Sequence, residues 1–174
     1  AEQNRIYNLM QSQTEDKVRK LSFLLDQYGK TEDMELLKRI AVITAYLKRR
    51  NNLIFLAEDS SEIPSVELQY CIKESLQTLS LFDIACAYDF KLTAHMTFAE
   101  MTNAYDVLET IIEKSLDTLI NLYLHIQKGA TGSQMTIALS AQADLSAIHI
   151  QNLTIQQEED KQWRLIYRIG GEVK

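Results

Sequence analysis

The residues whose types and spacing could do chemistry form one row in the second half of the chain. Between Ala99 and Ile126, acidic and amide side chains recur at every fourth position, at Glu109, Glu113, Asp117 and Asn121. Residues four apart share one face of an α-helix, so a helix here would align these groups over about three turns. Such a row is either a solvated helix face or part of a site, and the surrounding elements decide between the two.

Histidine and cysteine offer weaker candidates. The histidines stand at positions 95, 125 and 149 without short mutual spacing, and Cys71 and Cys86 lack the C-x-x-C pattern. We therefore expect no metal site. No base can be assigned to a nucleophile, which argues against Ser-His-Asp or Cys-His catalysis. Two isolated cysteines favour a reduced, cytoplasmic setting.

Composition limits the possible partners. The 174 residues are 46% apolar with one proline and five glycines, which favours long regular elements, mainly helices. A net charge of −6 argues against nucleic acid as a partner. Because no apolar run approaches about 20 residues, we expect no membrane contact by the chain itself. Its first residues open directly into helix-like sequence, so we expect a piece of a longer protein, which could be membrane-anchored.

The first 57 residues predict an antiparallel helical hairpin. Apolar spacing predicts a helix from Glu2 to Tyr28, ended by Gly29, and a second helix from Met34 to about Ala57, capped by Thr31 or Asp33. The second helix is apolar on more sides than one partner helix can cover. We therefore expect two hairpins to pair as a dimeric four-helix bundle. The predicted interface of this homodimer is Leu37, Ile40, Ala41, Thr44 and Leu47.

Polar residues interrupt this hairpin. Gln13, Thr14 and Lys17 fall where a bundle would normally bury leucine. They indicate either a loose or bent helix or a polar layer that lets a signalling helix exchange between two states. The basic run at 48–50 fans around the second helix, and we interpret it as a solvated helix end.

The remainder predicts a second domain. Residues 58–64 (EDSSEIP) have linker character and hold the only proline, so we divide the chain into domains 1–57 and 65–174. A helix is expected from Ser65 to about Leu81, then a strand at 85–92 and the long helix at 99–126. Alternating residues then predict strands in MTIALSA, AIHIQNLTI and WRLIYRI. Two helices on one face of a mixed sheet form a two-layer α/β sandwich, so the whole chain is α+β.

This layout resembles the cytoplasmic part of two-component sensor histidine kinases. The likeness rests on NRIYNLM near the start, the hairpin, and ETIIEKSLDTLINLYLHI followed by strand pairs. In that family the hairpin dimerises and carries the phosphorylated histidine. An ATPase domain of the GHKL type (gyrase, Hsp90, kinase, MutL) follows it.

The chemical positions of the family are altered. Tyr7 stands at the acceptor-histidine position, and Asn8 replaces the acidic residue after it. The Mg-ATP helix of the family aligns with Glu113, Asp117 and Asn121 as weak nucleotide-binding candidates, with Asp117 in place of the Mg-binding asparagine and without the basic pair. No D-x-G motif, lid helix or Gly-rich phosphate loop is found, since Gly170 and Gly171 lie at the end of the chain.

The resemblance therefore implies a degenerate kinase. We expect a signalling domain that transmits a signal through its dimeric bundle, with weak or lost ATP binding and phosphotransfer. A response regulator or another signalling protein would be its partner. Mg-ATP would bind weakly at most, and Tyr7 would not accept phosphate. The alternative is a non-catalytic dimerisation or adaptor module unrelated to ATPases.

Overall fold

A computed structural model describes the backbone of residues 2–170 and the side chains of residues 8, 12 and 14–170. Within this part of the chain the helices are α1 (Glu2–Thr31), α2 (Met34–Asp59), α3 (Val66–Ser80) and α4 (Phe98–Ser115), with a short 3₁₀ helix η1 (Leu145–Ala147). The strands are β1 (Glu62–Pro64), β2 (Ala85–Lys91), β3 (His95–Thr97), β4 (Asn121–Gly129), β5 (Gly132–Ser140), β6 (Leu153–Glu159) and β7 (Gln162–Ile169).

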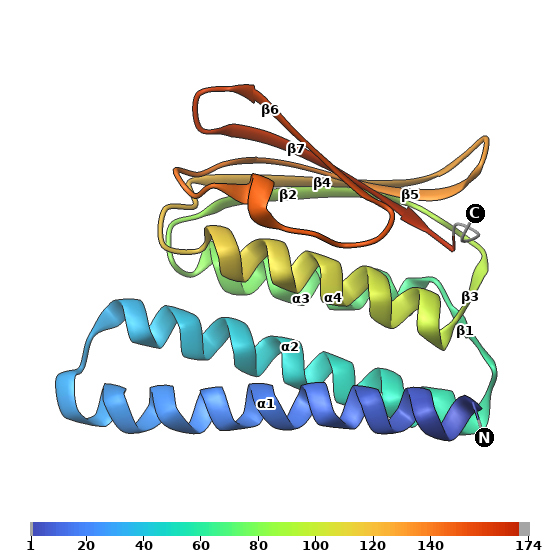
Figure 1. Ribbon diagram of the computed structural model, residues 1–174, viewed down its shortest axis with the longest axis horizontal. Helices are drawn as coiled ribbons and strands as arrows, with labels where there is room; N and C mark the ends of the chain where they lie inside the picture. The colour runs from blue at the N-terminus through green and yellow to red at the C-terminus, as the bar shows by residue number, and fades with distance from the viewer. Residues whose placement is uncertain (1, 171–174) are drawn as a thin grey trace.

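The elements stack in three layers (Figure 1). A five-stranded sheet has the order β2-β4-β5-β7-β6, in which β2 and β4 are parallel and the other pairs antiparallel. Helices α3 and α4 cover one face of this sheet, as expected for the α/β sandwich. The α1–α2 hairpin lies against the other side of α3 and α4 (Figure 1).

Local capping explains the hairpin turn. Asp33 is the N-cap of α2, and its Oδ1 accepts a hydrogen bond from the Glu35 backbone N–H at 3.0 Å. This confirms Asp33, one of the two caps expected from the sequence. The expected stop at Gly29 is wrong, because α1 continues through Thr31. The left-handed residue that ends the helix is Glu32, with φ of 52°.

The apolar surplus of α2 is covered within one chain. This helix packs between α1 on one side and α3 and α4 on the other. Of the predicted dimer contacts, Ile40 and Leu47 are buried by the chain itself, whereas Leu37 and Ala41 are half-buried and Thr44 is exposed. The surplus alone therefore does not require a second copy, and the dimeric bundle stays a prediction.

The long helix expected at 99–126 is wrong beyond Ser115. A capping box at Thr97 and Glu100 starts α4, which ends at Ser115, and the chain then turns into β4. Leu122, Leu124 and Ile126 alternate as buried residues of that strand, beside β2. Likewise, AIHIQNLTI forms a strand only from Leu153 onward, so His149 lies in the loop before β6.

One continuous core joins the layers. Leu108 and Ile111 of α4 have no exposed surface and belong to the same core cluster as Leu124 and Leu165 of the sheet. Beside it, the antiparallel pair of β1 and β3 ties the end of α2 to the start of α4, with Ile63 opposite Met96. The expected linker at 58–64 covers the last two residues of α2 and all of β1, and the separate folding of 1–57 and 65–174 stays a prediction.

Candidate functional site

A buried ion pair joins the hairpin to α4. The side chain of Arg50 is 1% exposed, and its guanidinium donates to both oxygens of Asp106, at 3.2 and 3.3 Å. A further N–H of Arg50 donates to Thr14 Oγ1 at 2.8 Å. Paired hydrogen bonds of this kind fix both distance and orientation. The expectation of a solvated helix end is therefore wrong: the run lies within α2, Arg50 is buried, and the half-buried Arg49 and the exposed Lys48 pair with Glu74 of α3.

Tyr46 completes this group. Its hydroxyl donates to Asp106 Oδ1 at 2.6 Å, and its ring lies 5.3 Å from the ring of Tyr105. Burial, together with the Asp106 carboxylate, raises the pKa of Tyr46 far above its ordinary value. Burial opposes the charge of Arg50, but Asp106 more than offsets this and raises the pKa of Arg50. The group therefore holds a neutral phenol, a charged guanidinium and a carboxylate.

The predicted nucleotide-binding residues lie in other surroundings. Glu113 pairs with Lys17 at 2.5 Å and with Lys20 at 3.5 Å, both on α1. Asp117 lies in the turn after α4 and pairs with Arg39 of α2 at 2.5 Å. Asn121 is the first residue of β4. The three residues do not share one helix face, because the helix ends between them.

The row of acidic residues on α4 thus meets the hairpin rather than solvent. The polar positions Thr14 and Lys17 face Arg50 and Glu113, which accounts for polar residues on the buried side of α1. The side chains of Gln13 and Tyr7 lie outside the described residues. Periodicity could not reveal these contacts, because the paired residues are far apart in the sequence, as with Lys17 and Glu113.

Glu109 is the unusual member of the row. It is 2% exposed, and its Oε1 has no hydrogen-bond partner among the described residues. Burial raises its pKa to about 8, and the nearby Glu113 adds to this effect. A carboxyl with a raised pKa and an unused oxygen is typical of functional sites, although structural networks also contain such groups.

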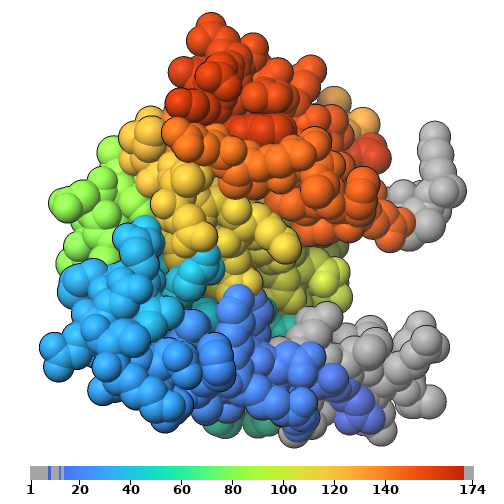
Figure 2. Space-filling model, turned by 60° about the vertical axis from the view of Figure 1, so that its left-hand side comes forward, coloured from blue at the N-terminus to red at the C-terminus, as the bar shows by residue number. Residues whose placement is uncertain are grey.

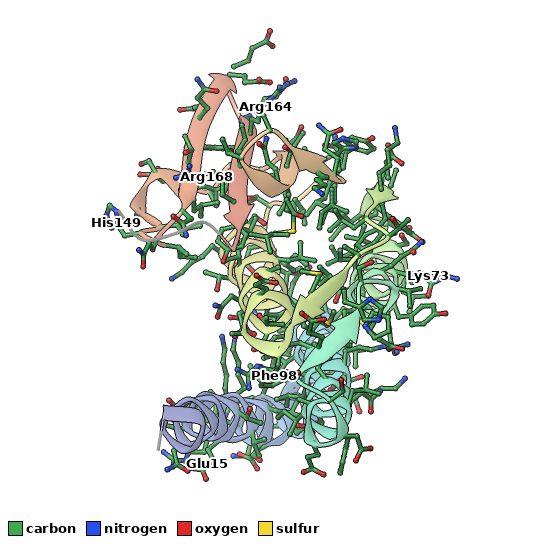
Figure 3. All side chains as sticks on the ribbon, turned by 90° about the vertical axis from the view of Figure 1, so that its right-hand side faces the viewer. Glu15, Lys73, Phe98, His149, Arg164 and Arg168 are labelled. Carbon is green, nitrogen blue, oxygen red and sulfur yellow. The ribbon has the colours of Figure 1, made fainter. Side chains whose placement is uncertain are left out.

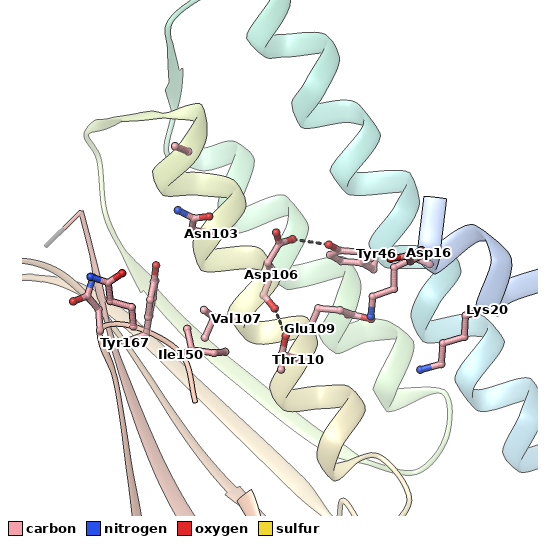
Figure 4. Close-up of a pocket in the computed structure, with 14 residues that line it drawn as sticks. Asp16, Lys20, Tyr46, Asn103, Asp106, Val107, Glu109, Thr110, Ile150 and Tyr167 are labelled. Atoms are coloured by element: carbon pink, nitrogen blue, oxygen red, sulfur yellow. Dashed lines mark hydrogen bonds between the residues drawn. The ribbon is translucent and has the colours of Figure 1, made fainter. Parts of the chain in front are cut away.

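A cleft of about 790 Å³ opens beside Glu109. Its walls come from α1, Tyr46 of α2, α4, the segment 150–152 and β7, and they include Lys20, Asn103, Asp106 and Tyr167 (Figure 4). The space-filling view shows the hollow between α1, in blue, and the orange segment that precedes β6 (Figure 2). The buried cluster and the cleft therefore form one candidate site.

A second polar contact lies on the sheet. His125 Nδ1 is 3.1 Å from Asp89 Oδ2, across the parallel pair of β4 and β2. His125 was expected at a helix end, and its true place follows from the correction of β4. Among the described residues no three His, Cys, Asp or Glu side chains converge as a metal site. Nor does any described helix have the length and apolar character needed to cross a membrane.

Similarity to known proteins is structural. No protein-family model matches the sequence, and a search of curated proteins finds no match. The fold is similar to the histidine kinase domain of the blue-light activated histidine kinase EL346 from Erythrobacter litoralis, with a TM-score of 0.52. The two share 8% identity over 83% of this chain and 82% of that chain. The fold of this chain is therefore histidine-kinase-like.

Two further structures align more loosely. A bacterial phosphotransferase gives a TM-score of 0.47 at 8% identity, covering 90% of both chains. The histidine kinase AdeS of Acinetobacter baumannii gives 0.41 at 10% identity, covering 89% of this chain and 96% of that chain.

Proposed function

We propose that this chain is a signalling module of the histidine-kinase type. It passes a conformational change between the hairpin and the α4–sheet layers, and it has weak or lost ATP binding and phosphotransfer. The observation that carries the proposal is the polar contact between the hairpin and α4, in which Arg50 and Tyr46 hold Asp106.

The chemistry of this contact suits a switch. Directional hydrogen bonds and ion pairs hold one arrangement firmly, yet they can exchange with water when the layers separate. An apolar contact of the same area would lose much more free energy when the layers separate, because its surface would be exposed to water. The histidine-kinase-like fold supports the same conclusion, because it places a helical hairpin beside an α/β layer.

The lining of the cleft argues for weak nucleotide binding. Asp16, Asp106 and Glu109 place carboxyl groups in the lining of the cleft, where they would disfavour a triphosphate. No glycine lies among the described residues of its walls, so backbone N–H groups are not gathered as in Gly-rich phosphate loops. Mg-ATP would therefore bind weakly at most, and Tyr7 would stay unmodified.

The partners follow from the same proposal. The module forms a homodimer in which Leu37, Ala41 and Thr44 of α2, which the chain leaves at least partly accessible, contact a second copy. A response regulator or another signalling protein receives the signal. The full-length protein operates in the cytoplasm.

Two measurements test the proposed function. Glu15→Cys in α1 and Arg168→Cys in β7 provide attachment sites for two spin labels, in a chain that also carries Cys86→Ser. The labels report the distance between the hairpin layer and the sheet layer. We expect a second distance population in Asp106→Ala but not in the control Asp89→Ala, which alters the sheet contact. Calorimetry with millimolar Mg-ATP should show no binding heat. One unchanged distance in Asp106→Ala would favour a rigid adaptor, and micromolar ATP affinity would restore an active kinase.

A further inference from the structure

We propose that the cleft between α1, α4 and β7 binds a small organic cation with a guanidinium group, and that Glu109 at its floor is the main contact. This proposal goes beyond the signalling role and holds whether or not the chain transmits a signal. It rests on the unpartnered carboxyl, the charges around the cleft and the aromatic side chains in its walls.

The first observation is the carboxyl itself. Glu109 is 2% exposed, yet it lines the cleft, so its buried end lies at the cleft floor. Its side chain points from α4 toward α1 (Figure 4). A buried polar atom that lacks a partner destabilises the fold, and a bound donor would remove this cost. Oε1 therefore marks where an N–H donor of a ligand would lie.

The second observation is the balance of charge. Three acidic residues line the cleft, namely Asp16, Asp106 and Glu109, against the two bases Lys17 and Lys20, and Asp106 is already paired with Arg50. Both lysines direct their ammonium groups to Glu113, which lies outside the cleft lining. Their charge is thus partly compensated already. A cation at Glu109 would supply the partner that its Oε1 lacks and would favour its ionised form.

The third observation favours a guanidinium over other cations. The chain already buries one guanidinium at this site, since Arg50 is held by Asp106 and lies beside Tyr46. The Tyr46 ring already has the Lys17 ammonium 5.5 Å from its centroid and packs against Tyr105, so the ligand would meet Tyr167, the other aromatic side chain of the lining. Planar guanidinium groups bond carboxylates and stack on aromatic rings with less loss of hydration than ammonium groups.

The ionisation of Glu109 should couple to binding. Burial raises its pKa to about 8, so most of it is protonated at neutral pH. Other charged or titratable groups act on it from three elements: Lys17 and Lys20 of α1, Tyr46 of α2, and Tyr105, Asp106 and Glu113 of α4. A cation stabilises the carboxylate, so binding should release a proton and strengthen as pH rises.

The test uses the whole chain and a matched pair of probes. Calorimetry compares n-butylguanidinium with n-butylurea, which has a similar shape and no charge. We expect a dissociation constant below about 1 mM for the cation, and no detectable binding of the urea. Affinity should rise about tenfold from about pH 6.5 to about pH 8, with proton release seen as buffer-dependent heat.

Variants separate the site from general attraction to an acidic chain. Glu109→Gln should weaken binding at least tenfold and abolish proton release. Asp16→Asn, at the exposed rim, should weaken it less. Glu15→Gln removes the same charge from the side of α1 that faces away from the cleft and should leave binding unchanged (Figure 3). Equal binding of both probes, or equal effects of Glu15→Gln and Glu109→Gln, would overturn the proposal.

Discussion

The two faces of α4 contact their neighbours through different interactions. Toward the sheet, Leu108 and Ile111 lie in an apolar core without exposed surface. Toward the hairpin, Asp106, Glu109 and Glu113 face basic and phenolic groups of α1 and α2. Apolar packing is non-directional and largely insensitive to pH and salt, whereas the polar contact depends on ionisation and geometry. The hairpin also adds Ile43 and Leu53 of α2 to the shared core, so the two faces of α4 differ in their polar contacts rather than in whether apolar packing is present.

The largest effect should come from the apolar side. Leu108→Ala removes a fully buried side chain and leaves a cavity, so we expect a loss of about 2–5 kcal/mol in the free energy of unfolding. Urea denaturation measures it. Leu81→Ala is the control, because Leu81 is 80% exposed and should change stability by less than about 0.5 kcal/mol. Similar losses in both variants would contradict the assignment of the core.

Removing one partner of the polar contact should lower the free energy of unfolding somewhat less than Leu108→Ala does. Arg50→Met leaves Asp106 without its guanidinium, and we expect a loss of about 2–3 kcal/mol, because 27% of the Asp106 side chain remains exposed to water. Denaturation of the triple variant Arg50→Met, Asp106→Leu, Tyr46→Phe sharpens the comparison. An apolar replacement of the whole group should recover most of the loss. If the triple variant stays as unstable as Arg50→Met, the contact contributes net stability rather than specificity.

Protonation of Glu109 should give a smaller, pH-dependent effect. Its pKa in the folded chain is about 8, above the ordinary value of 4.5, so between these values the folded state holds a proton that the unfolded state has released. Stability therefore falls as pH rises through this window, by about 2 kcal/mol between about pH 6 and about pH 8. Glu109→Gln should remove this slope in denaturation curves. A slope that persists would assign the proton to another group.

The smallest effect should follow from Asp117→Asn. The Asp117 side chain is 67% exposed, so its pair with Arg39 should contribute less than about 1 kcal/mol, and added salt should weaken it further. Thermal unfolding at low and high salt measures this contribution. Like the unchanged chain, this variant should show no binding heat with millimolar Mg-ATP. A loss of nucleotide binding in Asp117→Asn would support the sequence-based assignment of this residue.

Periodicity predicted the hairpin, the helices α3 and α4 and the strand β2, because each has one dominant apolar spacing. It failed at β4, where Leu119, Ile120 and Tyr123 fit a helical period and Leu122, Leu124 and Ile126 fit alternation. No glycine or proline marks the end of α4 at Ser115, so the predicted helix extended past its true end. The alternation in NLYLHIQ was the signal that could have found the strand.

The site was less accessible from sequence than the fold. Glu109 and Arg50 are charged residues, which usually face solvent, and nothing local indicates that they are buried. Their burial depends on α1 and α2 lying across α4. Such contacts join residues far apart in the chain, for example Arg50 and Asp106, and residue spacing carries no information about them.

The β1–β3 pair is a fixed connection at one end of the contact between the hairpin and α4. It fastens the end of α2 to the start of α4, so this edge would be the pivot of the hairpin motion that we propose. Along α4 from Thr97, Asp106 lies about 13 Å away and Glu113 about 24 Å. A tilt of about 10° would move the hairpin by about 4 Å at Glu113 and about 2 Å at Asp106. Of these two contacts, the Lys17–Glu113 pair would part before the Arg50–Asp106 pair.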